Sequence, residues 1–166
     1  MHANIQSPMS RTTDSSNTGH TFAPFAVVLL PFALAMHIAE EWFLGFPDWA
    51  RLALEIDIEA ARFLYTNLIG LALCSIGAAI SFREPGAAWI GVSLAALFSV
   101  NTILHAGLSV VVGVYSPGTI TGLFLYIPLS FLIFRWSATH LSRAAFAGAL
   151  LIGIGIHFAA TLAVLI

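Results

Sequence analysis

Five long apolar segments follow one another along the chain, separated by short polar breaks. They cover residues of about 23–45, 60–82, 87–113, 117–136 and 143–166. In a helix, an apolar run of about 20 residues spans a hydrocarbon core of roughly 30 Å. The pattern therefore predicts an all-α polytopic membrane protein. We expect one transmembrane helical bundle of about five helices over residues 22–166, with no second domain.

The breaks between these segments carry turn residues and charges. Residues 83–86, Arg-Glu-Pro-Gly, separate the second segment from the third, and residues 115–118, Tyr-Ser-Pro-Gly, separate the third from the fourth, with Ser116 as the predicted N-cap. The stretch from Arg135 to Arg143 closes the fourth segment. The longest connection, residues 46–59, fits a helix lying at the membrane interface and an ordinary polar loop with aromatic anchors equally well.

Composition supports a surface that faces lipid. Hydrophobic residues make up 59% of the chain and charged residues 8%, whereas a soluble domain has about a quarter of its residues charged. The net charge is −2 and the basic residues are scattered, so we expect membrane lipids and no nucleic acid as partners. Residues 1–21 are polar and predict a disordered tail. Cys74 is expected to pack in an apolar stretch.

Arginines are distributed unevenly between the two ends of the predicted bundle. Arg11, Arg83, Arg135 and Arg143 fall on the N-terminal side, and Arg51 and Arg62 fall on the opposite side. Positive residues near transmembrane helices favour the cytoplasmic side. The bias predicts a multi-pass protein of the cell membrane with its N-terminus in the cytoplasm and its C-terminus outside.

Several ionisable side chains lie inside the apolar segments, where a charge costs at least roughly 2.5–3.5 kcal/mol at a helix centre. His37, Glu40 and Glu41 follow an i, i+3, i+4 spacing in the first segment, so they share one face of a helix. Asn101 and His105, at i and i+4, share a face in the third. Two such faces on different helices are what an inward-facing polar site requires.

Depth brings these residues into one layer. When the middle of each segment is placed at the midplane with a rise of about 1.5 Å per residue, they lie on the non-cytoplasmic side, together with Asn67 and His157. This clustering favours a buried functional site over scattered structural residues. Ser116 and Thr119 lie at the outer mouth of the layer. There the N-terminus of the fourth helix either binds an anionic group or forms a capped turn.

Imidazole and carboxylate groups are the ligands of Zn and non-haem Fe sites, and inward-facing Glu and His three residues apart build metal sites in helix bundles. The candidate metal ligands are His37, Glu40, His105 and His157. The candidate catalytic residues are Glu41, as a general base, and Asn101. The candidate substrate-binding residues are Ser116, Thr119, Tyr65 and Asn67.

The same residues have structural interpretations. A single histidine in a membrane helix is often a hydrogen-bonded packing residue. Asn67 and Asn101 suit hydrogen bonds between helices. Glu41, beside Trp42 near the end of its segment, is also placed to reach the interface.

Three short motifs stand in these positions: His37-Ile38-Ala39-Glu40-Glu41, then Asn101 to His105 as Asn-x-x-x-His, then Ser116-Pro117-Gly118. In them the sequence resembles the HXXEE family of small membrane proteins over roughly residues 25–165. The resemblance implies a site at these residues and gives no reaction. The Glu-Glu pair is also similar to that of intramembrane CAAX-type proteases. Those enzymes have an arginine shortly after the glutamates, whereas the fourth residue after Glu41 is Gly45.

Four hypotheses of function follow. The first is a metal-dependent membrane hydrolase or oxidoreductase, using Zn or non-haem Fe, that acts on a lipid or another apolar small molecule. The second is a metal-free isomerase in which Glu40 or Glu41 moves protons. The third is a binding or carrier module for protons, a metal ion or a small molecule, although five helices lack the inverted second half of many transporters. The fourth is a structural or assembly role.

Overall fold

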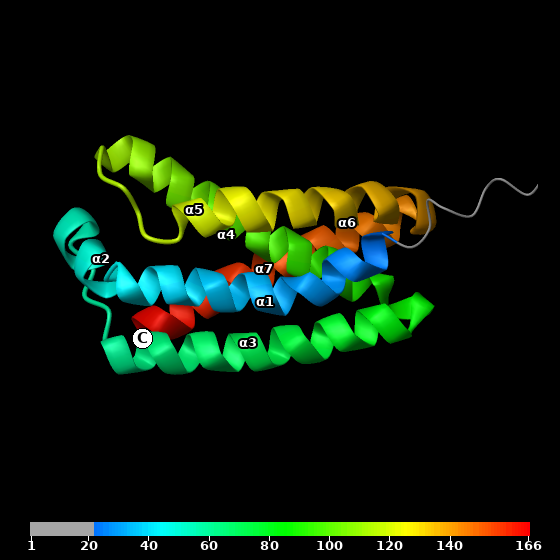
Figure 1. Ribbon diagram of the computed structural model, residues 1–166, viewed down its shortest axis with the longest axis horizontal. Coiled ribbons are helices and arrows are strands. Elements are labelled where there is room, and N and C mark those ends of the chain that lie inside the picture. The colour runs from blue at the N-terminus through cyan, green and yellow to red at the C-terminus, as the bar shows by residue number, and fades with distance from the viewer. Residues whose placement is uncertain (1–21) are drawn as a thin grey trace, which may run out of the picture.

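The computed structural model of the protein describes residues 22–166. The predicted tail, residues 1–21, lies outside the described residues. Within them the chain forms long helices that run side by side, with no strand (Figure 1). In chain order the elements are α1 (Phe22–Phe43), α2 (Phe46–Leu54), α3 (Ala60–Arg83), η1 (Pro85–Ala87), α4 (Ala88–Val112), α5 (Thr119–Thr121), η2 (Gly122–Tyr126), α6 (Ile127–His140) and α7 (Arg143–Leu165).

Five helical stretches are long and apolar enough to cross a membrane, so the predicted all-α bundle of about five long helices is confirmed. They are Phe25–Phe43, Ala60–Arg83, Ala88–Val112, Thr119–His140 and Arg143–Leu165. Their outward faces carry large apolar side chains, for example Phe32, Leu73 and Leu151, each more than 60% exposed. Extensive apolar surface of this kind is unfavourable in water and favourable in lipid. The fold therefore suggests insertion in a membrane.

Helix α4 contacts α3, α6 and α7, and small residues let it approach α7 closely. Gly153 on α7 packs directly against the carbonyl group of Ser93 on α4. The Ser93 hydroxyl donates to the Ala149 carbonyl oxygen at 3.0 Å. Lipid gives no hydrophobic force for helix association, so such close packing and hydrogen bonding hold membrane helices together. Helix α4 thereby becomes a fixed support for His105, which lies two turns before its end.

The fourth span begins and ends later than predicted. Its N-cap is Gly118 and its first helical residue is Thr119, so the prediction of Ser116 as N-cap was wrong. At the other end, α6 continues through Arg135 to His140, which the sequence placed in a connecting loop. The break is short because Ser142 caps α7 directly: its hydroxyl accepts a hydrogen bond from the backbone N–H three residues later.

The start of the fourth span contains a π-helical turn, η2, between α5 and α6. Gly122 begins this turn and packs on α4, where a Cβ atom would lie 2.9 Å from the Thr102 hydroxyl oxygen. The turn ends at Tyr126, which is fully buried. Such turns are frequent at functional sites, because the extra residue redirects neighbouring side chains. Here the turn places the Tyr126 ring against α1 and α4.

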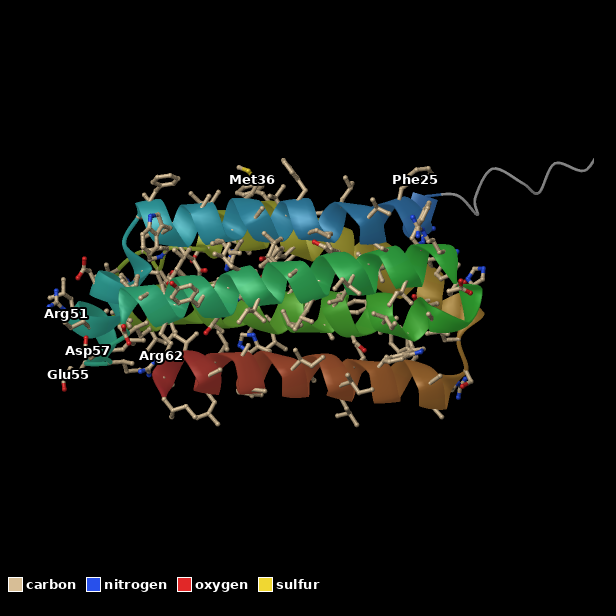
Figure 2. All side chains as sticks on the ribbon, turned by 90° about the horizontal axis from the view of Figure 1, so that it is seen from below. Phe25, Met36, Arg51, Glu55, Asp57 and Arg62 are labelled. Carbon is tan, nitrogen blue, oxygen red and sulfur yellow. The ribbon has the colours of Figure 1, made fainter. Side chains whose placement is uncertain are left out.

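Within the 46–59 connection, Phe46–Leu54 form the short helix α2; its place at a membrane interface stays a prediction. Trp49 and Ala50 are buried against Phe63 of α3, and Arg51 pairs with Asp48 at 2.8 Å on the exposed face. Figure 2 shows charged side chains gathered at this end of the bundle. The C-terminus lies at the same end, while α1 begins at the opposite one (Figure 1).

Candidate metal centre

Two histidines and one glutamate meet where α1 and α4 face each other. His105 Nε2 lies 3.2 Å from Glu41 Oε1, and His37 Nε2 lies 3.5 Å from the same oxygen. All three side chains are more than nine-tenths buried. His37 and Glu41 come together because they are one helical turn apart on α1, and α4 supplies His105. One nitrogen or oxygen atom of each residue lies within 4.8 Å of those of the other two.

The Nδ1 atoms of both histidine rings are hydrogen-bonded to hydroxyl groups. His37 Nδ1 is 2.8 Å from Thr121 Oγ1, and His105 Nδ1 is 3.0 Å from Ser116 Oγ. These contacts fix both rings so that their Nε2 atoms point toward Glu41. Metal-binding histidines are oriented in this way, with the second ring nitrogen hydrogen-bonded to a neighbouring group. We call His37, Glu41 and His105 the His/Glu centre.

The spacing within the His/Glu centre fits a metal ion. A tetrahedral ion about 2.1 Å from each ligand holds its ligand atoms about 3.4 Å apart. The two nitrogen-to-oxygen distances, 3.2 and 3.5 Å, lie on either side of that value. His37 Nε2 is buried and has no hydrogen-bond partner among the described residues. Buried polar atoms rarely lack a partner, and a metal ion bound to this nitrogen would supply one.

Aromatic rings enclose the His/Glu centre. The His37 ring lies 4.7 Å, between centroids, from the ring of Tyr126, and the His105 ring lies 5.2 Å from that of Phe46. Tyr126 in turn stacks on Phe98 at 4.1 Å. These rings keep the centre away from water and lower the local dielectric constant. A charge held there interacts more strongly with its neighbours than it would in water.

Glu40, one residue before Glu41, binds the start of the fourth span instead. Its Oε1 atom accepts from the backbone N–H groups of Gly118 at 2.9 Å and Ile120 at 3.2 Å, and its Oε2 atom accepts from that of Thr121 at 2.8 Å. The Tyr115 hydroxyl also donates to Glu40. A carboxylate satisfies N–H groups at a helix N-terminus and interacts favourably with the helix dipole. Glu40 is therefore the cap of this helix.

Gly118 lies between the cap and the centre. Its φ angle is +101°, a conformation that residues with a Cβ rarely adopt. A Cβ atom there would lie 2.7 Å from His37 Cε1 and 3.0 Å from His105 Cε1. Only glycine lets the backbone pass this close to both imidazole rings. The Ser-Pro-Gly element thus combines a hydroxyl that orients His105 with a residue small enough to pack on the pair.

Hydrogen bonds within the 109–119 segment hold Ser116 in place. The Ser109 hydroxyl accepts from the backbone N–H of Ser116 at 2.9 Å and lies 3.0 Å from the Thr119 hydroxyl. The Thr119 hydroxyl donates to the Ser116 carbonyl oxygen at 2.7 Å. Ser109 follows His105 by one helical turn, so α4 supplies both the histidine and the anchor of its hydroxyl partner.

Tyr115 directly precedes Ser116 and donates a hydrogen bond to Glu40. Partial burial, together with the hydrogen bond to Glu40, raises the pKa of the Tyr115 hydroxyl to about 12. The tyrosine therefore keeps its proton at neutral pH and donates it to the Glu40 carboxylate.

The structure brings part of the predicted site together. Of the four predicted metal ligands, His37 and His105 meet, and the glutamate beside them is Glu41 rather than Glu40. His157 is buried on α7, where its Nε2 atom has no hydrogen-bond partner among the described residues, and it is not a member of the centre. The roles assigned to these residues stay predictions.

Among the other predicted residues, Ser116 hydrogen-bonds a histidine of the centre. Asn101 is one turn before His105, and its Oδ1 atom is buried without a hydrogen-bond partner in the described part of the chain. Asn67 donates to the Phe63 carbonyl oxygen within its own helix. Tyr65 is 67% exposed. The N–H groups at the fourth span, predicted to bind an anionic group or form a capped turn, are occupied by Glu40.

Sequence reasoning missed Thr121 and Tyr115. The Ser-Pro-Gly element marked the segment between them, but no spacing rule connects Thr121 with His37, which is 84 residues away. The contact between Thr121 and His37 depends on how α5 packs against α1.

Comparison with known proteins gives one family. A family described as "Protein of unknown function with HXXEE motif" matches residues 28–133, which contain all of the motifs and the whole His/Glu centre. No curated protein and no solved structure matches the chain.

Proposed function

The chain belongs to the HXXEE family of proteins of unknown function, and on that premise we propose that it is a metal-dependent membrane enzyme. In this proposal His37, Glu41 and His105 hold a Zn or non-haem Fe ion. The substrate is a lipid or another apolar small molecule that reaches the ion from the bilayer.

The observation that carries the proposal is the approach of two oriented imidazoles to one buried carboxylate oxygen, at 3.2 and 3.5 Å. Catalytic zinc sites typically have three protein ligands, and a His₂Glu set is one known combination. The fourth position is left for water or substrate. A bound ion there would polarise a carbonyl group or activate water for hydrolysis, and iron would support oxidation.

The surroundings of the centre support this role. Thr121 and Ser116 hold the rings through Nδ1, which leaves Nε2 for the ion. Burial of the Glu41 carboxylate is unfavourable unless a positive charge compensates it. A divalent cation would supply that charge. Glu40, which the sequence suggested as a ligand, supports the proposal as the cap that fixes the segment carrying both hydroxyls.

Elemental analysis of the protein purified in detergent, after expression with ample Fe and Zn, tests the proposal. We expect about one ion per chain in the wild type, and loss of most of it in His105→Ala. His140→Ala is the matched control, because His140 lies at the far end of the bundle, at the end of α6. A wild-type protein without metal, whose thermal stability is also unchanged by chelators, would contradict the proposal.

We further propose that the α2 end of the bundle faces the outside of the cell and the opposite end faces the cytoplasm. Arg83, Arg135 and Arg143 lie in or beside the cytoplasmic ends of their helices, against Arg51 and Arg62 at the α2 end. Single cysteines at Ser142 and Asp57, in a Cys74→Ser background, test the orientation. An impermeant thiol reagent added to intact cells should label the Asp57→Cys protein alone; labelling of the Ser142→Cys protein alone would reverse the assignment.

A further inference from the structure

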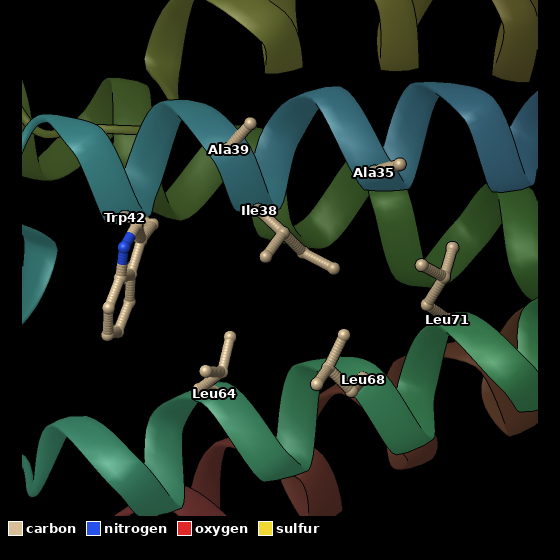
Figure 3. A pocket seen from close by; sticks show the side chains of 7 residues that line it. All are labelled: Ala35, Ile38, Ala39, Trp42, Leu64, Leu68 and Leu71. Atoms are coloured by element: carbon tan, nitrogen blue, oxygen red, sulfur yellow. The ribbon is translucent and has the colours of Figure 1, made fainter.

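An apolar groove runs between α1 and α3. It has a volume of about 220 Å³. Its lining residues are Ala35, Ile38, Ala39 and Trp42 of α1 and Leu64, Leu68 and Leu71 of α3 (Figure 3). Apart from the indole nitrogen of Trp42, every side-chain heavy atom among these is carbon. The groove offers no group that would recognise a polar ligand along its length.

The groove has the dimensions of a single hydrocarbon chain. Figure 3 shows Trp42 opposite Leu64 at one end and Ala35 near Leu71 at the other. Seven residues of helix correspond to about 10 Å. Over that length, 220 Å³ gives a mean cross-section of about 20 Å². An apolar protein cavity of roughly 150 Å³ already accepts benzene, so the volume suffices for several methylene groups in a row.

The position of the groove indicates which kind of apolar ligand it would bind. Both of its helices are membrane-spanning candidates, so the groove opens at the depth of the lipid hydrocarbon. Its Trp42 end lies next to α2, where the span reaches the interface, and tryptophan is enriched at that depth. Its Ala35 end lies near the middle of the span. A lipid in the leaflet on the α2 side would therefore place its polar end at Trp42 and its chain toward Ala35.

We propose that this groove binds one acyl chain of a membrane lipid and that the lipid is the substrate of the His/Glu centre. Trp42, at the polar end of a bound lipid, directly follows Glu41 on α1, so the ester region would lie at the height of the centre. The identity of the lipid as substrate rests on the proposed function. Binding of the chain in the groove rests on the groove alone.

Photocrosslinking tests the binding step. Protein in nanodiscs is irradiated with a phosphatidylcholine that carries a diazirine on one acyl chain, and labelled peptides are mapped by mass spectrometry. We expect labels to concentrate on residues 35–42 and 64–71. Leu68→Trp should reduce groove labelling at least threefold by filling the space. Leu73→Trp is the matched control, since Leu73 is on the same helix and 64% exposed, and it should leave the labelling unchanged.

The variants separate the two proposals. In His105→Ala protein the chain should still label the groove, because the groove contains no part of the centre; metal loss with retained labelling would remove the proposed reaction and leave the lipid site. Ala39→Leu is a second obstruction for use if Leu68→Trp does not fold. Labels spread evenly over the outer surface, or equal labelling in the two tryptophan variants, would overturn the lipid site. Crosslinks between two copies through groove residues would assign the groove to a dimer interface instead.

Discussion

Glu40 and Glu41 are neighbours in the chain, yet their carboxylates bind different parts of the molecule. Glu41 approaches His105 of α4 at 3.2 Å, whereas Glu40 accepts hydrogen bonds from the backbone at the start of the fourth span. Consecutive residues of a helix point about 100° apart, so two adjacent carboxylates can face two different helices. Glu41 points to the same side of α1 as His37, which is one helical turn away.

Both glutamates stabilise the arrangement of the two histidines, Glu41 by direct contact and Glu40 through the segment that holds their rings. Glu40 holds the segment that begins at Tyr115, and that segment carries the Ser116 and Thr121 hydroxyls. Those hydroxyls orient the two histidines that approach Glu41. Helix α1 therefore contributes both a group of the centre and the cap that positions the groups supporting it.

Exchange of each glutamate for glutamine should separate these roles. Glu41→Gln removes the charged group of the proposed metal site, and we expect Zn²⁺ affinity to fall by more than about 100-fold, since even loss of a supporting partner typically costs about 10–100-fold. Glu40→Gln should keep stoichiometric metal but lower the thermal unfolding temperature, because loss of a helix cap costs about 0.5–2 kcal/mol. Competition titration with a zinc chelator and thermal unfolding in detergent measure the two effects. The opposite pattern, with metal lost in Glu40→Gln alone, would restore Glu40 as the ligand.

Removal of the Thr121 hydroxyl should weaken the centre without removing a ligand. Thr121→Val keeps the side-chain shape but leaves His37 Nδ1 without its partner, and we expect metal affinity to fall about 10–100-fold. Thr139→Val is the control, since its hydroxyl bonds the Trp136 carbonyl oxygen at the opposite end of the bundle. The same chelator competition compares them. Equal affinities in the two variants would mean that Thr121 does not orient His37 for binding.

The number of spans was predictable because apolar length is a local property of the sequence. The i, i+4 spacing of His37 and Glu41 was equally local, and it correctly placed both on one helical face. The choice between Glu40 and Glu41 was different. Both lie within one turn of His37, and only the positions of α4 and α5 around α1 decide which carboxylate meets His105. Spacing along one helix contains no information about those positions.

The prediction for His157 rested on depth, and depth does not define the direction around a helix axis. His157 is buried on α7, but the residues whose ligand atoms lie within 4.8 Å of one another are His37, Glu41 and His105. The Ser-Pro-Gly element shows the converse. Its sequence marked a turn, while its contacts with His105 and His37 depend on a backbone conformation, φ +101° at Gly118, that only the folded chain defines.

Substitution of Gly118 should be unusually costly. Gly118→Ala forces a Cβ atom into an unfavourable backbone conformation and against both imidazole rings, and we expect destabilisation of about 1–3 kcal/mol. Gly70→Ala is the matched control, because a Cβ atom there meets nothing within 4 Å and alanine is the better helix former by up to about 1 kcal/mol. Thermal unfolding in detergent should show a lower midpoint for Gly118→Ala and an equal or higher one for Gly70→Ala. Similar midpoints would argue against close packing of Gly118 on the histidines.

Ionisation of Tyr115 should report on the Glu40 cap. The pKa of its hydroxyl is raised from 10.0 to about 12, first by burial and then by the hydrogen bond to Glu40. The folded chain therefore holds this proton more tightly than the unfolded chain. The resulting contribution to stability is complete below pH 10 and is lost as the pH rises through 12. The tyrosinate absorbance of wild type minus that of Tyr115→Phe isolates this residue during a pH titration.

In Glu40→Gln protein the same titration should have a lower midpoint, because the charged hydrogen-bond acceptor is gone and the tyrosinate no longer forms beside a carboxylate. The midpoint should stay above 10, since the partial burial of the ring is unchanged. Tyr65→Phe, at an exposed position on α3, is the control and should leave the Tyr115 difference signal as it is in the wild type. A wild-type midpoint near 10, or one that Glu40→Gln does not move, would show that Tyr115 and Glu40 are not bonded, and the capping of the fourth span by Glu40 would have to be revised.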